Sequence, residues 1–176
     1  GVGTIESAEP VERGAHVIGF VRRMILKFFV GRSMPDLAVP ADFCRVTAKL
    51  QPVEGSNITA EVWLPNEWNG KVLAIGGGGF NGGLSTAAIM LKTPLGRGYA
   101  GIATDAGHKD TDSAKFTREF PEQYVDYAYR ANHVAAGFVK ELAANYYGSA
   151  VQRAYFHGCS NGGRDALMEA RKFPED

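Results

Sequence analysis

Hydrophobic and polar residues alternate along two neighbouring stretches of the chain. Residues 44–51 and 57–64 carry apolar side chains at about every second position, and the polar sequence Glu54-Gly55-Ser56 separates them. A period of two is typical of strands that bury one face. We therefore predict a β-hairpin over these two stretches.

Short apolar runs follow the hairpin and alternate with segments of helical period. The runs at 71–75 and 99–104 have the composition of buried parallel strands, and 153–157 is the next predicted strand. Helices are predicted at 85–92, where Pro94 is expected to stop the helix, and at 165–173. A long helix is predicted from apolar residues at steps of three and four, with Gly148 beyond its end; these residues are Ala128, Ala131, Ala135, Phe138, Leu142 and Tyr146. This order predicts an α/β fold with a mostly parallel sheet and helices on both faces.

The first 42 residues differ from this pattern. Residues 1–14 are polar and acidic, and residues 16–30 are apolar with basic side chains inside the run. A signal peptide carries its charges before the apolar stretch. Three interpretations stay open: a segment docked on the main domain, a membrane-surface helix, and a misplaced start or degenerate leader. We treat 1–42 as an extension of uncertain structure and 43–176 as the domain.

Composition excludes several classes of protein. The 176 residues contain 19 basic and 19 acidic side chains, so the net charge is zero and no basic excess indicates a nucleic-acid partner. Two cysteines cannot build a disulfide scaffold. No apolar run reaches the roughly 18 residues of a membrane span. The composition is that of an ordinary globular domain.

A nucleophile motif lies between the last predicted strand and the last predicted helix. Residues 158–162 read Gly-Cys-Ser-Asn-Gly and fit G-x-S-x-G in the strand-turn-helix context that this motif requires. The serine, Ser160, would project from the turn as a nucleophile. The backbone N–H of Asn161, at the helix start, would face the developing oxyanion.

Residues 76–83, Gly-Gly-Gly-Gly-Phe-Asn-Gly-Gly, form a glycine loop directly after a predicted strand. In a hydrolase, such a loop supplies the second oxyanion donor, and the candidates are the N–H groups of Gly78, Gly79 and Phe80. The rival interpretation is a non-catalytic binding domain or a dinucleotide-binding domain, because the loop also fits G-x-G-x-x-G. That site would use Gly77, Gly79, Gly82 and Asp105.

Five stretches together resemble the tannase and feruloyl esterase family; they are residues 43–47, 61–83, 104–108, 127–133 and 156–176. The most specific of them is the Cys-Ser pair followed by Asn-Gly-Gly-Arg. The resemblance implies an α/β-hydrolase with a large inserted lid. It further implies hydrolysis of aromatic carboxylic esters through an acyl-enzyme on Ser160, and a disulfide from Cys159 to the segment that bears the catalytic histidine.

All four histidines precede Ser160, whereas this fold places its catalytic acid and histidine after the serine. We therefore expect the chain to be the N-terminal part of the enzyme, without the lid, the triad Asp and His, and the partner of Cys159. His108 is a candidate to line the site. His133 and His157 are expected to be structural, and Arg164 to order the turn around Ser160.

The remaining expectations concern cofactors, partners and location. No cofactor or metal is expected in this chain. The absent lid is a possible site for calcium. The expected partner is a small aromatic ester, without nucleic acid or a membrane span. The resemblance suggests a secreted or periplasmic protein, although no clear leader is visible. A bond between Cys44 and Cys159 stays open, as do the acyl specificity and the oligomeric state.

Overall fold

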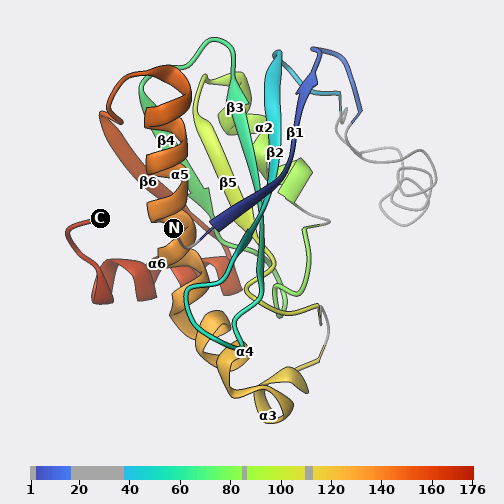
Figure 1. The fold of residues 1–176 in the computed structure, drawn as a ribbon, viewed down its shortest axis with the longest axis vertical. Helices are drawn as coiled ribbons and strands as arrows, with labels where there is room; N and C mark the ends of the chain where they lie inside the picture. The colour runs from blue at the N-terminus through green and yellow to red at the C-terminus, as the bar shows by residue number, and fades with distance from the viewer. Residues whose placement is uncertain (1–2, 17–37, 85–86, 110–112) are drawn as a thin grey trace.

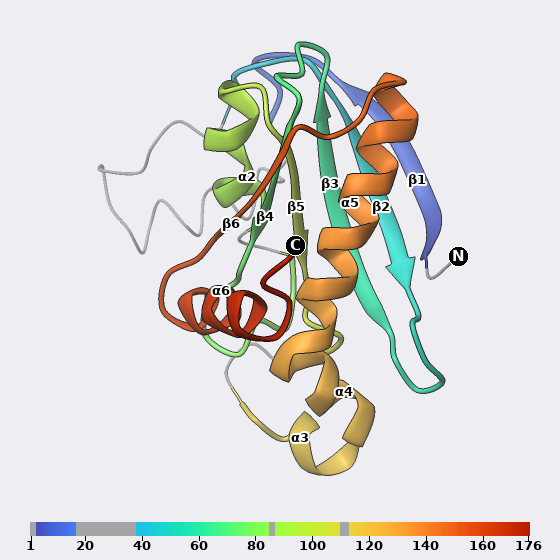
Figure 2. The same ribbon diagram turned by 90° about the vertical axis from the view of Figure 1, so that its left-hand side faces the viewer.

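A computed structural model of the chain describes residues 3–16, 38–84, 87–109 and 113–176. Within these residues, six strands form one sheet in the order β1-β2-β3-β5-β4-β6, with helices on both faces (Figures 1 and 2). The strands are β1 Gly3–Val11, β2 Phe43–Leu50, β3 Ile58–Pro65, β4 Lys71–Ile75, β5 Ala100–Thr104 and β6 Arg153–His157. The helices are α2 Ala87–Gly96, α3 Phe116–Glu119, α4 Pro121–Val125, the π-helix η2 Asp126–Arg130, α5 Ala131–Tyr147 and α6 Asn161–Lys172.

The predicted hairpin is confirmed. Strands β2 and β3 pair antiparallel, from Phe43 opposite Pro65 to Leu50 opposite Ile58. The even-numbered apolar residues of β3 belong to the core under α5, whereas Trp63 belongs to the core under α2. The even-numbered residues therefore produce the alternation, and Trp63 shows that the other face of β3 is covered as well.

Strand β1 was not predicted. It pairs antiparallel with β2 at the edge of the sheet, from Gly3 opposite Leu50 to Val11 opposite Phe43. Most of its side chains are exposed. Because the strand buries little, its sequence lacks the apolar alternation that reveals a strand. The apolar stretch 16–30 lies, apart from His16, outside the described residues.

The α/β class is confirmed, and within the described residues the sheet is mixed rather than mostly parallel. Strand β4 pairs parallel with β5 and with β6, and the other pairings are antiparallel. The parallel part is the part whose strands are joined by helical crossovers, as parallel pairing requires. It contains the three strands whose carboxyl ends carry the candidate chemistry.

Two helices cover the sheet from opposite sides (Figure 2). Residues Ala131, Ala135, Val139 and Ala143 of α5 pack on the larger core cluster, and Leu91 and Leu95 of α2 pack on the smaller one. Small residues on α5 allow its backbone to approach the sheet closely. None of the helices in the described ranges is long and apolar enough to cross a membrane.

Two helix ends differ from the prediction, and one agrees. Helix α2 continues past Pro94 to Gly96, so the predicted stop is wrong. Proline lacks the N–H that would reach the carbonyl one turn earlier, but its own carbonyl accepts hydrogen bonds from the N–H groups of Arg97 and Tyr99 and closes the last turn. Helix α6 begins at Asn161, earlier than predicted. Helix α5 ends at Gly148, which has the left-handed φ of 65° expected of a glycine stop.

Candidate active site

Three loops meet at the carboxyl ends of the parallel strands. They follow β4, β5 and β6, and these strands run in the same direction. In Figure 1 these ends point toward the part of the molecule that holds α3, α4 and α6. Ligands of open α/β sheets bind at this edge. The glycine loop and the elbow, defined here as residues 158–162, are two of the three loops.

Ser160 occupies a strained position at the tip of the elbow. Its φ is 57° and its ψ is −123°, a conformation that non-glycine residues rarely adopt. The residue is exposed, and α6 begins with the next residue. Strain of this kind persists only where the surrounding structure imposes it, and it is characteristic of a nucleophile held on a strand-to-helix turn.

Backbone-to-backbone packing imposes this turn. A Cβ added to Gly158 would lie 2.0 Å from the carbonyl oxygen of Gly162, and one added to Gly76 would lie 2.6 Å from the Gly162 Cα. The Gly76 N–H also donates a hydrogen bond of 2.9 Å to the His157 carbonyl. The start of the glycine loop therefore lies directly against the first turn of α6, with no room for a side chain between them.

This packing brings the glycine loop beside the elbow. The glycine loop turns where the Asn81 N–H donates to the Gly78 carbonyl at 3.0 Å. A Cβ on Gly78 would meet nothing within 4 Å, so the loop is open there. That the N–H groups of Gly78, Gly79 and Asn161 serve as oxyanion donors stays a prediction.

The side chain of Asn161 is fixed by two residues from different helices. Its Oδ1 accepts hydrogen bonds from the Tyr127 hydroxyl at 3.0 Å and from Arg164 Nε at 2.7 Å. Arg164 also donates to the carbonyls of Tyr127 and Ala128, and its guanidinium lies 4.3 Å from the centre of the Tyr127 ring. These contacts agree with the expectation that Arg164 orders the elbow.

Tyr127 was missed as a site residue. Tyr127 lies in the stretch 127–133 that resembles the family, and this was the only indication of a role in the site. A helical period by itself assigns an aromatic residue to the core. Its ring touches His108, at 5.7 Å between centroids, and lies 6.4 Å from Phe80 of the glycine loop. Tyr127 thus joins the three loops.

His108 is buried and stacks on Phe116 with 3.6 Å between ring centroids. That it lines a substrate site stays a prediction.

Asp126 is a second missed residue, and it anchors the loop after β5. Its carboxylate is fully buried and accepts hydrogen bonds of 2.6 Å from Ser56 Oγ and from Arg130 Nε. A Cβ on Gly107 would lie 2.7 Å from the Asp126 Cβ. The loop that carries His108 therefore rests on the π-helix. The unusual helix geometry gives this residue no recognisable spacing in the sequence.

The dinucleotide interpretation is not supported by the geometry of Asp105. Its carboxylate is fully buried and accepts hydrogen bonds from the N–H groups of Thr59 and Gly107, and Lys109 forms an ion pair with it. A ribose-binding carboxylate must instead reach the ligand. Asp105 supports its loop.

Both cysteines are free in the described residues. Cys44 lies on β2 and Cys159 follows β6, and four strand-to-strand steps of roughly 4.8 Å each separate these strands. A disulfide requires Cα atoms within about 7 Å, so the two cannot pair with each other. Burial raises the pKa of the Cys44 thiol. Cys159 is exposed, and its bond to another segment stays a prediction.

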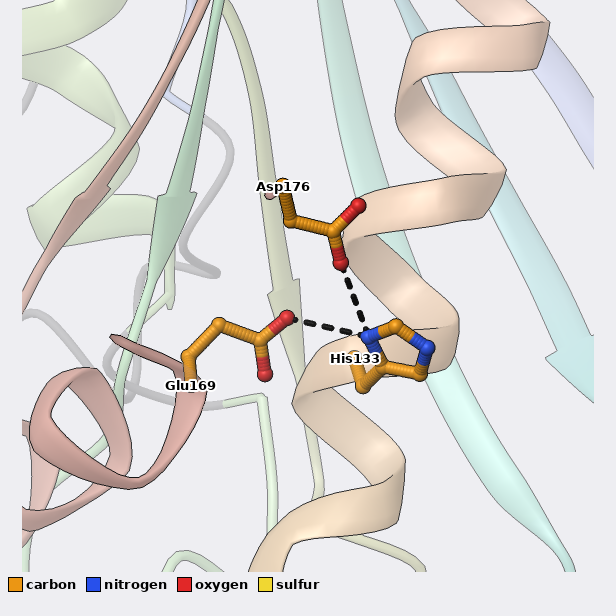
Figure 3. Close-up of side chains that lie close together, drawn as sticks. All are labelled: His133, Glu169 and Asp176. Atoms are coloured by element: carbon orange, nitrogen blue, oxygen red, sulfur yellow. Dashed lines mark hydrogen bonds and ion pairs between the residues drawn. The ribbon is translucent and has the colours of Figure 1, made fainter. Parts of the chain in front are cut away.

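His133, Glu169 and Asp176 form a polar cluster between α5 and the end of α6 (Figure 3). His133 Nδ1 lies 3.1 Å from Glu169 Oε1 and 2.9 Å from Asp176 Oδ2. The donor atoms are close enough together to hold a metal ion. However, Lys140 already supplies a cation to Asp176 at 2.6 Å, and the His133 ring stacks on Phe173 at 3.5 Å. We interpret the cluster as a structural tie between the two helices.

Replacing Glu169 with glutamine is expected to weaken the pH dependence of stability. Burial raises the pKa of Glu169, and His133 opposes this. The folded state therefore holds this proton more tightly than the unfolded chain. The tighter binding of the Glu169 proton adds to the free energy of unfolding at low pH. This addition is lost as pH rises through the raised pKa of Glu169.

Denaturant unfolding of the full-length wild-type and Glu169→Gln proteins over about pH 4–7 measures the effect. The stability of the wild type relative to the variant should fall across this window. A difference that is constant, or that grows with pH, would contradict the assignment. Asp176 is common to both proteins; burial acts to raise its pKa, but Lys140 and His133 lower it overall.

A groove of about 560 Å³ lies on the α2 side of the sheet, beside the edge strand β6. Its lining includes Met90, Arg97, Tyr155 and His157, but neither Ser160 nor a residue of the glycine loop. His157 thus lies on the strand, exposed to this groove. The groove reaches the ends of β4 and β6 at Ile75 and His157, directly before the glycine loop and the elbow.

Comparisons with known proteins agree with this arrangement. The family described as tannase and feruloyl esterase matches residues 44–176. A probable feruloyl esterase B-1 from Aspergillus terreus is 36% identical over 138 residues, which are 78% of this chain and 26% of that protein. A probable feruloyl esterase B-2 from Aspergillus flavus is 32% identical over 142 residues, or 81% of this chain and 27% of that protein.

Solved structures show the same similarity. Feruloyl esterase B from Aspergillus oryzae superimposes with a TM-score of 0.76 and 27% identity, over 99% of this chain and 32% of that one. Tannin acyl hydrolase from Aspergillus niger has a TM-score of 0.67 at 22% identity, over 99% of this chain and 32% of that one, and shares the fold. The chain spans about a quarter of the length of the curated relatives it matches.

Proposed function

We propose, from the premise that the chain belongs to the tannase and feruloyl esterase family, that it carries the nucleophile and oxyanion site of a carboxylic ester hydrolase. The observation that carries the proposal is the strained, exposed Ser160 at the start of α6, with the glycine loop packed against the same turn. A glycine-rich turn with a purely structural role would not require a serine in this strained backbone conformation.

In the proposed reaction, Ser160 Oγ attacks the carbonyl carbon of the ester while a general base takes its proton. Negative charge develops on the carbonyl oxygen. The N–H of Asn161 and an N–H of Gly78 or Gly79 would stabilise it, aided by the N-terminal end of α6. Collapse of the tetrahedral intermediate releases the alcohol and leaves the acyl group on Ser160. Water then hydrolyses the acyl-enzyme.

The general base is proposed to come from a part of the full-length protein outside these 176 residues. His133 is engaged with Glu169 and Asp176, and His108 is buried against Phe116. Cys159 is exposed beside the nucleophile, where the family resemblance implies a disulfide to the segment that bears the histidine. Such a bond would hold the base next to Ser160.

The proposed substrates are esters of aromatic carboxylic acids. The relatives are named feruloyl esterases, and a structural neighbour is named a tannin acyl hydrolase. For the full-length protein we also propose secretion, and a lid that could hold calcium. No step of the proposed reaction requires a cofactor.

A fluorophosphonate should label the full-length protein at Ser160. The reagent phosphonylates an activated serine and mimics the tetrahedral intermediate, so it needs both the nucleophile and the oxyanion donors. Intact mass would show one adduct, and peptide mapping would place it on Ser160. Heat-denatured protein, which lacks the site, serves as the control and should stay unlabelled. Absence of labelling, or labelling of another residue, would overturn the proposal.

A further inference from the structure

We infer that Asp165 and Asn81 together hold the glycine loop in register with the elbow, and so act as positioning residues for the oxyanion donors. The inference rests on the proposed function, because it assigns a role within that reaction. Neither residue would touch the substrate. They act through the backbone of Gly78 and Gly79.

Asp165 lies in α6, one helical turn after Asn161. Its side chain is fully buried. Its Oδ2 accepts a hydrogen bond of 3.0 Å from Asn81 Nδ2. The carboxylate therefore binds the glycine loop shortly after Gly78 and Gly79.

Asn81 is held in a conformation that depends on this contact. Its φ is 69°, in the left-handed region, and the residue is 5% exposed. Its Oδ1 has no hydrogen-bond partner among the described residues. The same Oδ1 lies 1.4 Å from where a Cβ on Gly77 would stand. The Asn81 amide thus fills the inside of the loop, and Asp165 is what fixes its orientation.

Arg164 connects this pair to the other oxyanion donor. Its Nη2 lies 2.6 Å from Asp165 Oδ1, and its Nε donates to Asn161 Oδ1 at 2.7 Å. Burial raises the pKa of Asp165, whereas Arg164, Asn81, Asn132 and the Gly77 backbone act in the opposite direction. A buried carboxylate is costly unless it is fully bonded. Here its bonds join the glycine loop to the residue after the nucleophile.

The expected effect follows from what oxyanion donors contribute. Removal of one donor from such a site lowers kcat by about 10²–10³-fold. Loosening the loop displaces a donor without removing it, so we expect kcat to fall by about 10–100-fold. KM should change by less than about three-fold, because the donors act mainly on the transition state.

The test uses the full-length protein with the single variants Asp165→Asn and Asn81→Ala and the double variant Asn81→Asp/Asp165→Asn. The double variant restores an amide facing a carboxylate with the two partners exchanged. Hydrolysis of a methyl ester of ferulic acid gives kcat and KM. Amide hydrogen exchange of the peptide that contains residues 76–83 reports the order of the loop without reference to hydrolysis.

Glu61→Gln is the matched control. Glu61 is also a buried carboxylate, 3% exposed, that pairs with an arginine, but it lies on β3 and bonds Arg45 and Trp63. Its neutralisation should lower stability and leave kcat unchanged. It therefore separates loss of loop position from general loss of stability.

We expect both single variants to lower kcat and to speed amide hydrogen exchange in residues 76–83. The double variant should recover at least a third of the loss in log kcat. Single variants that hydrolyse with kcat within two-fold of wild type would overturn the inference and leave the proposed function intact. Unchanged exchange in residues 76–83 would overturn it as well. A wild-type protein that does not hydrolyse esters would instead overturn the proposed function, and the inference with it.

Discussion

Replacing Ser160 with alanine is expected to abolish ester hydrolysis by the full-length protein, with kcat falling by at least about 10⁴-fold. The variant keeps the backbone donors but has no hydroxyl to form the acyl-enzyme. What remains would be catalysis by the oxyanion donors acting on water. Initial rates on a methyl ester of ferulic acid, together with fluorophosphonate labelling, measure the effect.

Ser7→Ala is the control for this variant. The Ser7 hydroxyl bonds Thr47 at 2.7 Å between β1 and β2, away from the elbow. Its loss should leave kcat and labelling unchanged. If Ser160→Ala kept a tenth of the wild-type kcat, Ser160 could not be the nucleophile. Labelling of that variant at the wild-type rate would lead to the same conclusion.

Gly158→Ala is expected to be strongly destabilising. The added Cβ would stand 2.0 Å from the Gly162 carbonyl oxygen and 2.2 Å from its carbonyl carbon, and both atoms belong to the backbone. No side-chain rotation relieves such a contact, so the elbow must open. We expect a loss of about 3 kcal/mol or more in stability, or a loss of measurable hydrolysis where the protein still folds.

Gly163→Ala supplies the matched comparison, because it adds the same methyl group to the same turn. Its Cβ would meet only the Gly158 carbonyl oxygen, at 3.7 Å, which is an ordinary contact. It should cost little or add stability through helix propensity. Thermal midpoints and kcat of the two variants measured side by side test the packing. Equal effects would contradict the close approach of the two backbones.

The sequence was sufficient for the elements that leave a period or a stop signal. The alternation in 44–51 and 57–64 predicted β2 and β3, because every second side chain of a strand points to the same face of the sheet. Gly148 marked the end of α5, because the left-handed φ there favours glycine. The motif around Ser160 places glycines where two backbones touch, at Gly158 and Gly162, and the structure has that close approach.

The sequence was insufficient where burial is low or where partners are distant along the chain. Strand β1 is mostly exposed and left no alternation, so only its pairing with β2 reveals it. Pro94 predicts the end of a helix, but α2 continues past it and loses only the one backbone hydrogen bond that proline cannot donate.

What the sequence by itself determined, then, is the α/β class, the hairpin, the family resemblance and the identity of the candidate nucleophile. Only the tertiary structure decided what surrounds Ser160. It brought Asn81 to Asp165 across 84 positions of sequence and Tyr127 to Asn161 across 34. Local periodicity carries no information about such contacts, because they depend on how strands and crossovers bring loops to one edge of the sheet. The same geometry engaged Asp105 within its own loop and separated Cys44 from Cys159, which no spacing in the sequence could show.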